Sequence, residues 1–209
     1  MNSNFVDKYF FIIFSLIPIS IIVGPTVSLI NILIIVISFL FYIIKNNEWS
    51  WLKSKSVKLL LILYLYLIFN SFIAIDSSLT LVRNFGFIRF VFFFAAFNYF
   101  FYKYEYFNKI FVIWFFLLII LTFDIFLEAS TGSNMLGYGV GDRIVSFFKD
   151  EQVIGTFVAS FFLLIIGYFF EIIKNDEKIK KYSTLFLSCI FLTAIILTGE
   201  RSITIKIVI

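Results

Sequence analysis

The sequence has 209 residues and contains no histidine, one cysteine and only two prolines. Without histidine it lacks the commonest transition-metal ligand and any serine–histidine or cysteine–histidine pair. Cys189 alone excludes an intramolecular disulfide, and its place inside an apolar run predicts a core residue. The sequence has no Gly-x-x-x-x-Gly-Lys-Ser/Thr loop and no Gly-x-Gly-x-x-Gly helix start, so nothing indicates nucleotide hydrolysis or dinucleotide binding. We therefore expect neither a bound metal nor a cofactor.

Charged residues are scarce as well, at 14% against 62% hydrophobic residues, and the mean hydropathy is +1.04. This balance is far from that of a soluble domain. The apolar runs approach the roughly 17–25 residues that a helix needs to cross a bilayer, and they lack the alternation of barrel strands. The expected fold class is an all-α integral membrane protein. It would be a polytopic helical bundle that forms a single transmembrane domain over residues 1–209.

Seven transmembrane helices and an incomplete eighth are predicted from these runs. The first run is not followed by a small-residue cleavage site, so we interpret it as a retained span and not as a signal peptide. The predicted spans are Tyr9–Val23, Thr26–Ile44, Leu59–Ile75, Asn84–Tyr102, Ile110–Leu127, Val153–Phe170 and Tyr182–Thr198. The eighth span is expected to begin near Ile203 and is incomplete at Ile209.

The loops between the spans differ in their cations, which predicts the orientation of the chain. One set of loops is rich in lysine and contains Lys45, Lys53, Lys55, Lys58, Lys103, Lys109, Lys174, Lys178, Lys180 and Lys181. The opposite set contains only Arg83, Arg143, Lys149 and Arg201. The positive-inside rule therefore places the amino terminus in the cytoplasm. It also accounts for the net charge of +4, so we expect no nucleic-acid partner.

Arginine predominates among the few cations of the outer side, whereas the inner loops use lysine. A guanidinium group presents a fixed fork that binds carboxylate or phosphate through two hydrogen bonds, and lysine is a compact hydrated charge. Outer arginines therefore indicate an anionic ligand on that face. Interfacial snorkelling is the alternative explanation for any single arginine.

The main outer loop, residues 128–152, contains four glycines that allow tight turns. Arg143 is followed by apolar residues, which predicts an interfacial or re-entrant segment with the guanidinium directed into a cavity. Asp150 and Glu151 are candidate ligand-binding residues. They also suit the first turn of the sixth span, because acidic groups are favourable near a helix amino terminus.

Further candidates lie at the outer ends of other spans. The turn that contains Glu200 and Arg201 could present N–H groups, a hydroxyl and a guanidinium to a phosphate, or the two charges could neutralise one another. Asp124 lies one helical turn before Glu128 on the same face, and Arg143 or Arg201 could be their partner. Arg89 lies about 9 Å deeper than Arg83 along a helix, which makes it the better cavity residue.

Together these motifs resemble the amino-terminal half of bacterial O-antigen ligase and O-antigen polymerase-type membrane proteins. The first motif reads Asp124-Ile-Phe-Leu-Glu128-x-x-x-Gly132-x-Asn134-x-x-Gly137 and continues with Arg143, Phe147-Phe148, Asp150-Glu151 and Gly155. The second, Gly199-Glu200-Arg201-Ser202, is similar to the Gly/Ser-x-Arg motif of that family. Where the family often has Arg-x-Ser-Gly, this sequence has Arg143-Ile-Val-Ser146.

The resemblance implies a multi-pass glycosyltransferase of the bacterial inner membrane that works on the periplasmic face without a metal. Its partners would be a glycan donor on undecaprenyl diphosphate and a lipid A core acceptor, with Arg143 and Arg201 holding the diphosphate. Relatives carry a catalytic histidine in a later periplasmic loop. We therefore expect this sequence to be an amino-terminal portion that is inactive alone, with its general base beyond Ile209.

Three alternatives stay open. A lipid-linked oligosaccharide polymerase would share the donor and the arrangement of spans. A transporter or flippase would place charges and broken helices near the middle of the bilayer. In a structural membrane subunit, the outer arginines would have no ligand.

Overall fold

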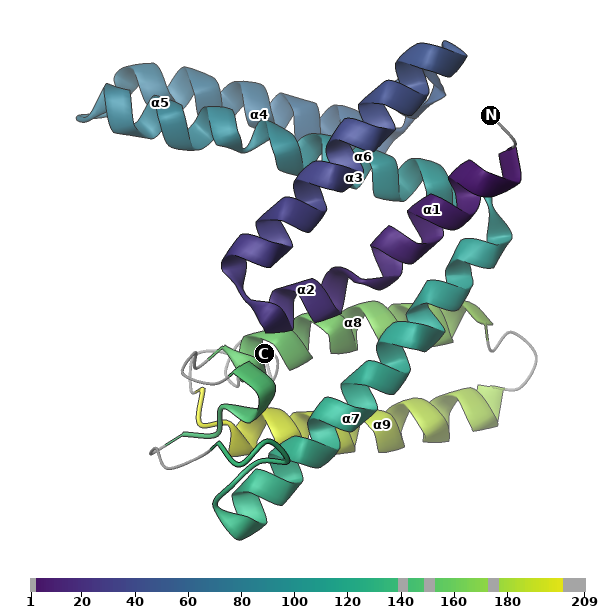
Figure 1. Cartoon of the computed structure of the whole chain (residues 1–209), viewed down its shortest axis with the longest axis vertical. Coiled ribbons are helices and arrows are strands. Elements are labelled where there is room, and N and C mark those ends of the chain that lie inside the picture. The colour runs from purple at the N-terminus through teal and green to yellow at the C-terminus, as the bar shows by residue number, and fades with distance from the viewer. Residues whose placement is uncertain (1–2, 139–142, 149–152, 173–176, 201–209) are drawn as a thin grey trace. The chain divides into compact units, whose positions relative to one another are not determined.

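The computed structural model describes residues 3–138, 143–148, 153–172 and 177–200. All regular elements in these ranges are helices (Figure 1). The chain divides into two compact units, Met1–Asn108 and Lys109–Ile209. The expectation of a single transmembrane domain stays a prediction.

The first unit begins with a bent pair of helices, α1 (Ser3–Ser15) and α2 (Ile17–Val23). The bend measures 42° and comes just before Pro18, which lacks the N–H that would continue the helical ladder. Gly24 then adopts a φ of 141°, and Pro25 starts α3 (Pro25–Asn46). A proline is well suited to the first turn of a helix, where its N–H would have no helical partner.

The rest of the first unit contains α4 (Lys55–Ile73), α5 (Ser77–Gly86) and α6 (Ile88–Lys103), with short 3-10 helices at Ser50–Lys53 (η1) and Glu105–Asn108 (η2). Asp76 caps α5 by accepting a hydrogen bond from Leu79 N. The Asn84 side chain donates to Ser71 Oγ at 2.7 Å, which ties α5 to α4 along its side (Figure 1). Arg83 therefore lies on α5, one residue before the span that was predicted to begin at Asn84.

Aromatic rings form the core of the first unit. The rings of Phe10 and Phe100 stack with their centres 4.1 Å apart, and Phe107 stacks on Phe100 from η2 at 5.4 Å. Phe14 and Phe39 are fully buried beside them. Such large rings bury much surface and interlock at fixed angles, so they hold α1, α3 and α6 together.

The second unit packs α7 (Lys109–Thr131), α8 (Ile154–Ile172) and α9 (Glu177–Leu197) against one another. Trp114 on α7 meets Phe161 on α8 with ring centres 5.3 Å apart, and Phe162 meets Phe191 on α9 at the same distance. A short 3-10 helix, Ser146–Phe148 (η3), lies in the segment between α7 and α8.

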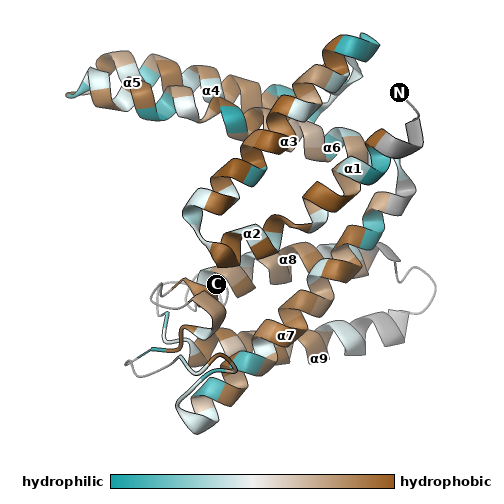
Figure 2. Cartoon of the chain, viewed as in Figure 1, coloured by the Kyte–Doolittle hydropathy of each residue, from teal (hydrophilic) through white to brown (hydrophobic). Residues whose placement is uncertain are grey.

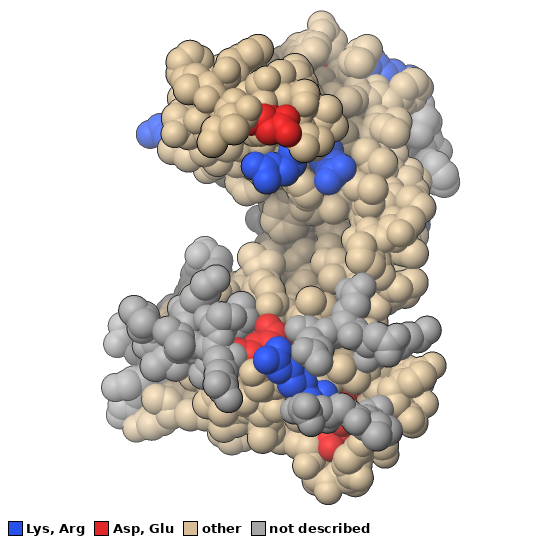
Figure 3. Space-filling view, turned by 90° about the vertical axis from the view of Figure 1, so that its left-hand side faces the viewer, with Lys and Arg blue, Asp and Glu red and all other residues tan. Residues whose placement is uncertain are grey.

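The helices are coloured mostly as hydrophobic in Figure 2, and many of their large apolar side chains are exposed, as a bilayer requires. On α4, Leu59 is 69% exposed and Ile62 is 67% exposed. On the face drawn in Figure 3, charged side chains gather in a few small groups. In the described ranges, four helical segments are long and apolar enough to span a membrane, or five if the bent α1–α2 pair is one span. They are Pro25–Asn46, Lys55–Ile73, Ser77–Lys103 and Lys109–Thr131.

Each of the seven complete predicted spans coincides with one of these helices, with a helix pair, or with α8 or α9. The incomplete eighth span, expected from near Ile203, lies outside the described residues. The described apolar parts of α8 and α9, Ile154–Phe170 and Tyr182–Leu197, are shorter than the four long segments. An all-helical membrane protein is therefore supported, whereas seven spans and a cytoplasmic amino terminus stay predictions.

Candidate functional site

Two carboxylates are buried at the end of α7, on one face of the helix as their spacing predicts. Asp124 is completely buried, and Glu128 is 5% exposed. Asp124 accepts hydrogen bonds from Met135 N at 2.8 Å and from the Ser146 hydroxyl. Glu128 accepts from Val145 N at 3.2 Å and from Ser146 N at 2.7 Å. The sequence offered Arg143 or Arg201 as a partner of these acids. The hydrogen bonds that the structure shows come from N–H and O–H groups of the following loop, and Arg201 lies outside the described residues.

Asn134 forms the second anchor of this loop. Its Oδ1 accepts from Leu136 N and Tyr138 N at 3.0 and 2.8 Å, which fixes the turn that contains Gly137. Its Nδ2 donates to the carbonyl oxygen of Ser146. Through these contacts the backbone and side chain of Ser146 bond to Asp124, Glu128 and Asn134. We name these four residues the loop anchor.

Ser146 has a φ of 47°, in the left-handed region that residues other than glycine rarely adopt. This conformation costs about 1–2 kcal/mol for a residue with a side chain. The bonds to Asp124 and Glu128 are charge-assisted and therefore strong, which explains how the conformation is maintained. The loop anchor thus fixes the backbone immediately after Arg143.

Glu200 caps the amino terminus of α8 from the far end of α9. Its carboxylate accepts from Gly155 N at 2.7 Å, Thr156 N at 3.1 Å and Thr156 Oγ1 at 2.8 Å. A carboxylate at this end of a helix satisfies first-turn N–H groups and complements the helix dipole. Gly155 allows the close approach, because a side-chain carbon there would lie only 2.6 Å from Thr198 Oγ1 and 2.9 Å from Glu200 Cδ.

Arg143 is exposed and lies beside the turn that carries Glu200. Its Cγ would be 3.7 Å from a side-chain carbon added at Gly199, a residue with a φ of 73°. Two motifs that are far apart in sequence therefore meet at this end of the second unit. Among the described residues between 132 and 153, Arg143 is the one cation.

The remaining predicted site residues do not join this group in the structure. Arg89 begins α6 in the first unit, is half-buried and places its guanidinium 4.9 Å from the centre of the Phe90 ring. Its Nε is buried and has no hydrogen-bond partner among the described residues. Arg201, Asp150 and Glu151 lie outside the described residues.

Sequence reasoning did not assign roles to Ser146, Asn134, Thr156 or Thr198. A signal existed for Asn134, because Asn-x-x-Gly is a common turn sequence in which the side chain bonds to following N–H groups. Nothing in the local sequence indicates that Glu200 caps α8, because the contact joins residues 45 positions apart. In the described ranges, no group of three acidic, cysteine or histidine side chains is arranged to hold a metal ion.

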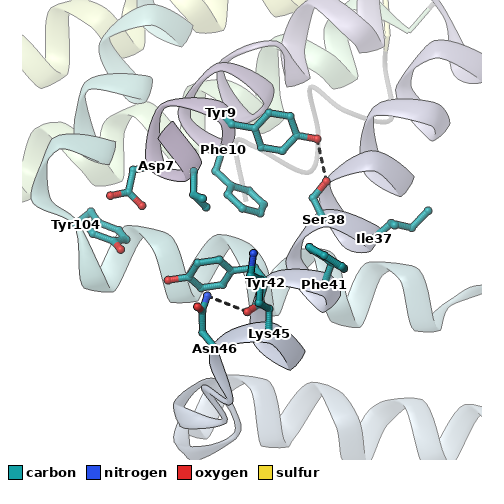
Figure 4. A pocket seen from close by; sticks show the side chains of 11 residues that line it. Asp7, Tyr9, Phe10, Ile37, Ser38, Phe41, Tyr42, Lys45, Asn46 and Tyr104 are labelled. Atoms are coloured by element: carbon teal, nitrogen blue, oxygen red, sulfur yellow. Dashed lines mark hydrogen bonds between the residues drawn. The ribbon is translucent and has the colours of Figure 1, made fainter. Parts of the chain in front are cut away.

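The described part of the first unit contains cavities, and two of them are lined by none of the predicted site residues. One, of about 450 Å³, lies between α1 and α3 and has Asp7, Tyr42 and Tyr104 on one side (Figure 4). On its other side, Tyr9 and Ser38 share a hydrogen bond of 2.9 Å between their hydroxyl groups. Burial, followed by the neighbouring Tyr42, raises the pKa of the Tyr104 phenol above its ordinary value.

Comparison of the chain with protein-family models, with curated proteins and with solved structures found no match. The structure defines a class, an all-helical protein with apolar helices that can span a membrane. Its second unit carries an exposed arginine on a loop that buried carboxylates hold in place.

Proposed function

We propose that this chain is the amino-terminal part of an O-antigen ligase-type glycosyltransferase of the bacterial inner membrane. In this proposal seven spans cross the membrane, the amino terminus is cytoplasmic, and the loop of residues 128–152 faces the periplasm. Arg143 and Arg201 bind the diphosphate of an undecaprenyl-linked glycan, which is transferred to the lipid A core of lipopolysaccharide. Asp150, Glu151 and Arg89 stay candidate ligand contacts.

The observation that carries the proposal is the meeting of Arg143 with the Gly199–Glu200 turn. The sequence indicated the Arg143 motif and the Gly199–Glu200 motif as parts of one anion-binding site. That the two motifs lie close together is a separate observation. The backbone is also fixed on both sides of this contact. The loop anchor holds the loop that carries Arg143, and the Glu200 cap holds the turn that contains Gly199. A fixed guanidinium stabilises a diphosphate leaving group more as its charge grows, and so favours the transition state.

The conformation of Ser146 gives separate support. The resembled family often has glycine at the position before the Phe pair, and here Ser146 occupies that position with a φ of 47°. Glycine is the residue that adopts such a φ most readily. This chain therefore differs from the family pattern in the residue at this position, but Ser146 keeps the backbone conformation that glycine favours.

The roles of the carboxylates follow from their contacts. Glu200 was a candidate ligand residue, and in this proposal it acts by positioning the Gly199 turn against α8. Asp124 and Glu128 position the loop that carries Arg143. All three carboxylates accept hydrogen bonds from backbone N–H groups, which is a suitable arrangement for a rigid support.

The test is expression of the complete reading frame in cells that lack their O-antigen ligase, with polymer attached to lipid A core as the readout. We expect attachment with the parent and a fall of about 100-fold or more for Arg143→Ala, the usual effect of removing one group that stabilises a transition-state charge. Arg83→Ala on α5 is the matched control and should attach polymer as the parent does. Equal attachment by Arg143→Ala and the parent, at equal membrane insertion, would overturn the proposal.

The same cells separate the two nearest alternatives. A lipid-linked oligosaccharide polymerase would lengthen the glycan on its carrier and leave lipid A core unmodified.

The bent α1–α2 pair is a broken helix of the kind that transporters use, but the residues at its break, Leu16, Ile17 and Pro18, are uncharged. A transport role therefore has weaker support.

A further inference from the structure

The cavity between α1 and α3 brings polar side chains together from three separate segments of the first unit (Figure 4). Asp7 comes from α1, Tyr42 lies near the end of α3, and Tyr104 follows the end of α6. All three side chains are half-buried, and Figure 4 draws them on the same side of the cavity. A carboxylate and two hydroxyl groups can all accept hydrogen bonds, so this group suits a ligand that donates several.

The ring core holds the two tyrosines of this group in place. Tyr42 and Tyr104 both pack against the buried Phe100, with ring centres 5.8 and 6.2 Å away. Tyr42 also contacts the ring of Phe10 at 6.2 Å, and Tyr104 contacts that of Phe107 at 6.0 Å. Rings packed in this way have fixed orientations, so the two hydroxyl groups are positioned before a ligand binds.

Asp7 gives this side of the cavity a negative charge. Its carboxylate interacts with the Tyr104 hydroxyl and, at longer range, with Lys103. It forms no ion pair with any described lysine or arginine, because Lys103 itself is paired with Glu48 at 2.9 Å. A carboxylate that is partly removed from water is stabilised by a cation that also donates hydrogen bonds. The three acceptors therefore favour a ligand with an ammonium group.

Apolar side chains form another wall of the same cavity and continue onto the exposed face of α3. Ile37 and Phe41 line the cavity, and each is 64% exposed. The volume of about 450 Å³ is within the range of small-molecule sites. Asp7 and Tyr104 lie at the ends of candidate spans, where lipid headgroups meet the protein. An acyl chain beside Ile37 and Phe41 therefore stays in the apolar layer while its headgroup reaches Asp7.

We propose that this cavity binds a phospholipid with a phosphoethanolamine headgroup, whose primary ammonium group donates to the Asp7 carboxylate and to the hydroxyls of Tyr42 and Tyr104. A primary ammonium has three N–H donors for these three acceptor groups, whereas a choline headgroup has the same charge and no N–H. Lys45 lines the same cavity and complements the phosphate. The lipid is preferred to a free amine because the site continues into the apolar wall. This inference is independent of the proposed glycosyltransferase activity.

The test is a lipid titration of the purified full chain in detergent, followed by native mass spectrometry. The probes are dioleoylphosphatidylethanolamine, dioleoylphosphatidylcholine, dioleoylphosphatidylglycerol and free ethanolamine. We expect phosphatidylethanolamine to bind at least about fivefold more tightly than either other lipid. Asp7→Asn should weaken its binding by about tenfold, and Tyr42→Phe and Tyr104→Phe by about fivefold each, because each variant loses a hydrogen bond to a charged group.

The matched controls lie in the same unit and outside this cavity. Asp76→Asn removes a carboxylate charge from the cap of α5, and Tyr102→Phe removes the hydroxyl of a side chain that is 93% exposed. Both controls should bind phosphatidylethanolamine as the parent does. The two tyrosine variants of the cavity keep the rings that pack on Phe100, so they test the site even if Asp7→Asn does not fold.

Four results would overturn the inference. Equal binding of phosphatidylethanolamine and phosphatidylcholine would show that the site does not recognise the N–H donors. Tighter binding of phosphatidylglycerol would show that it selects an anionic lipid. Displacement of the lipid by millimolar ethanolamine would assign the site to a free amine. Unchanged affinity in the folded variants of Asp7, Tyr42 and Tyr104 would remove the cavity from lipid binding.

Discussion

The two units of this chain use their buried residues for different purposes. In the first, stacked rings such as Phe10 and Phe100 hold helices against one another. In the second, buried polar groups such as Asp124 and Glu128 hold a loop against the end of a helix. Helices satisfy their own backbone groups, whereas irregular backbone near a membrane needs partners from the protein. Buried carboxylates are therefore found where the chain has to leave the helical conformation.

This comparison predicts that the largest loss of stability comes from the ring core. Phe100→Ala removes a fully buried ring that contacts Phe10 and Phe107, and should lower the free energy of unfolding by about 3–5 kcal/mol. Unfolding in mixed micelles, followed by the fluorescence of Trp49 and Trp51, reports on this unit. Phe94→Ala on the same helix is the control, because Phe94 is 38% exposed and should cost far less. Equal losses would show that the rings do not form a core.

The second prediction concerns the loop anchor. Asp124→Asn replaces an acceptor of two hydrogen bonds by a group that can no longer accept both well, so the second unit should lose about 1.5–3 kcal/mol. Trp114 lies in this unit and reports its unfolding when the other two tryptophans are replaced by phenylalanine. Ser130→Ala on the same helix is the control, since the exposed Ser130 hydroxyl donates to Leu127 O within the helix and should contribute little. If Asp124→Asn lowered the free energy of unfolding no more than the control does, the role of Asp124 would be contradicted.

The third prediction uses two glycines of α8. Gly155→Ala places a carbon 2.6 Å from Thr198 Oγ1 and should destabilise the second unit by about 1–3 kcal/mol, the usual cost of overpacking. Gly167→Ala meets no atom within 4 Å and should stabilise the helix by up to about 1 kcal/mol. The same Trp114 measurement compares them, and effects of equal sign would refute the close contact with α9.

The smallest effect is expected at the surface of the first unit. Glu48→Gln removes the ion pair with Lys103, whose side chain is 37% exposed, and should cost no more than about 1 kcal/mol. The effect should shrink further as salt is added, because exposed charges are screened. A loss that is larger and independent of salt would show that the pair acts as part of a buried network.

Sequence patterns predicted many local features of this molecule, although Cys189, which was expected in the core because it lies in an apolar run, is exposed on α9. Apolar runs located the helices, and the spacing of Asp124 and Glu128 placed both carboxylates on one face of α7. Features that depend on contacts between distant residues were not predictable. No local signal shows that Asn84 and Ser71 bring α5 alongside α4, or that Ser146 adopts a left-handed conformation between two acids. Pro18 did give a local signal for the bend between α1 and α2, although one continuous span was predicted there.

The cap on α8 also has a consequence for biosynthesis. Glu200 lies 45 residues after Gly155, so the growing chain has to extend through all of α9 before its carboxylate exists. Until then, the first-turn N–H groups of Gly155 and Thr156 have to bond to water or to lipid headgroups. The amino-terminal end of α8 is therefore completed only after α9 has been synthesised, which makes the two helices a pair that is completed together.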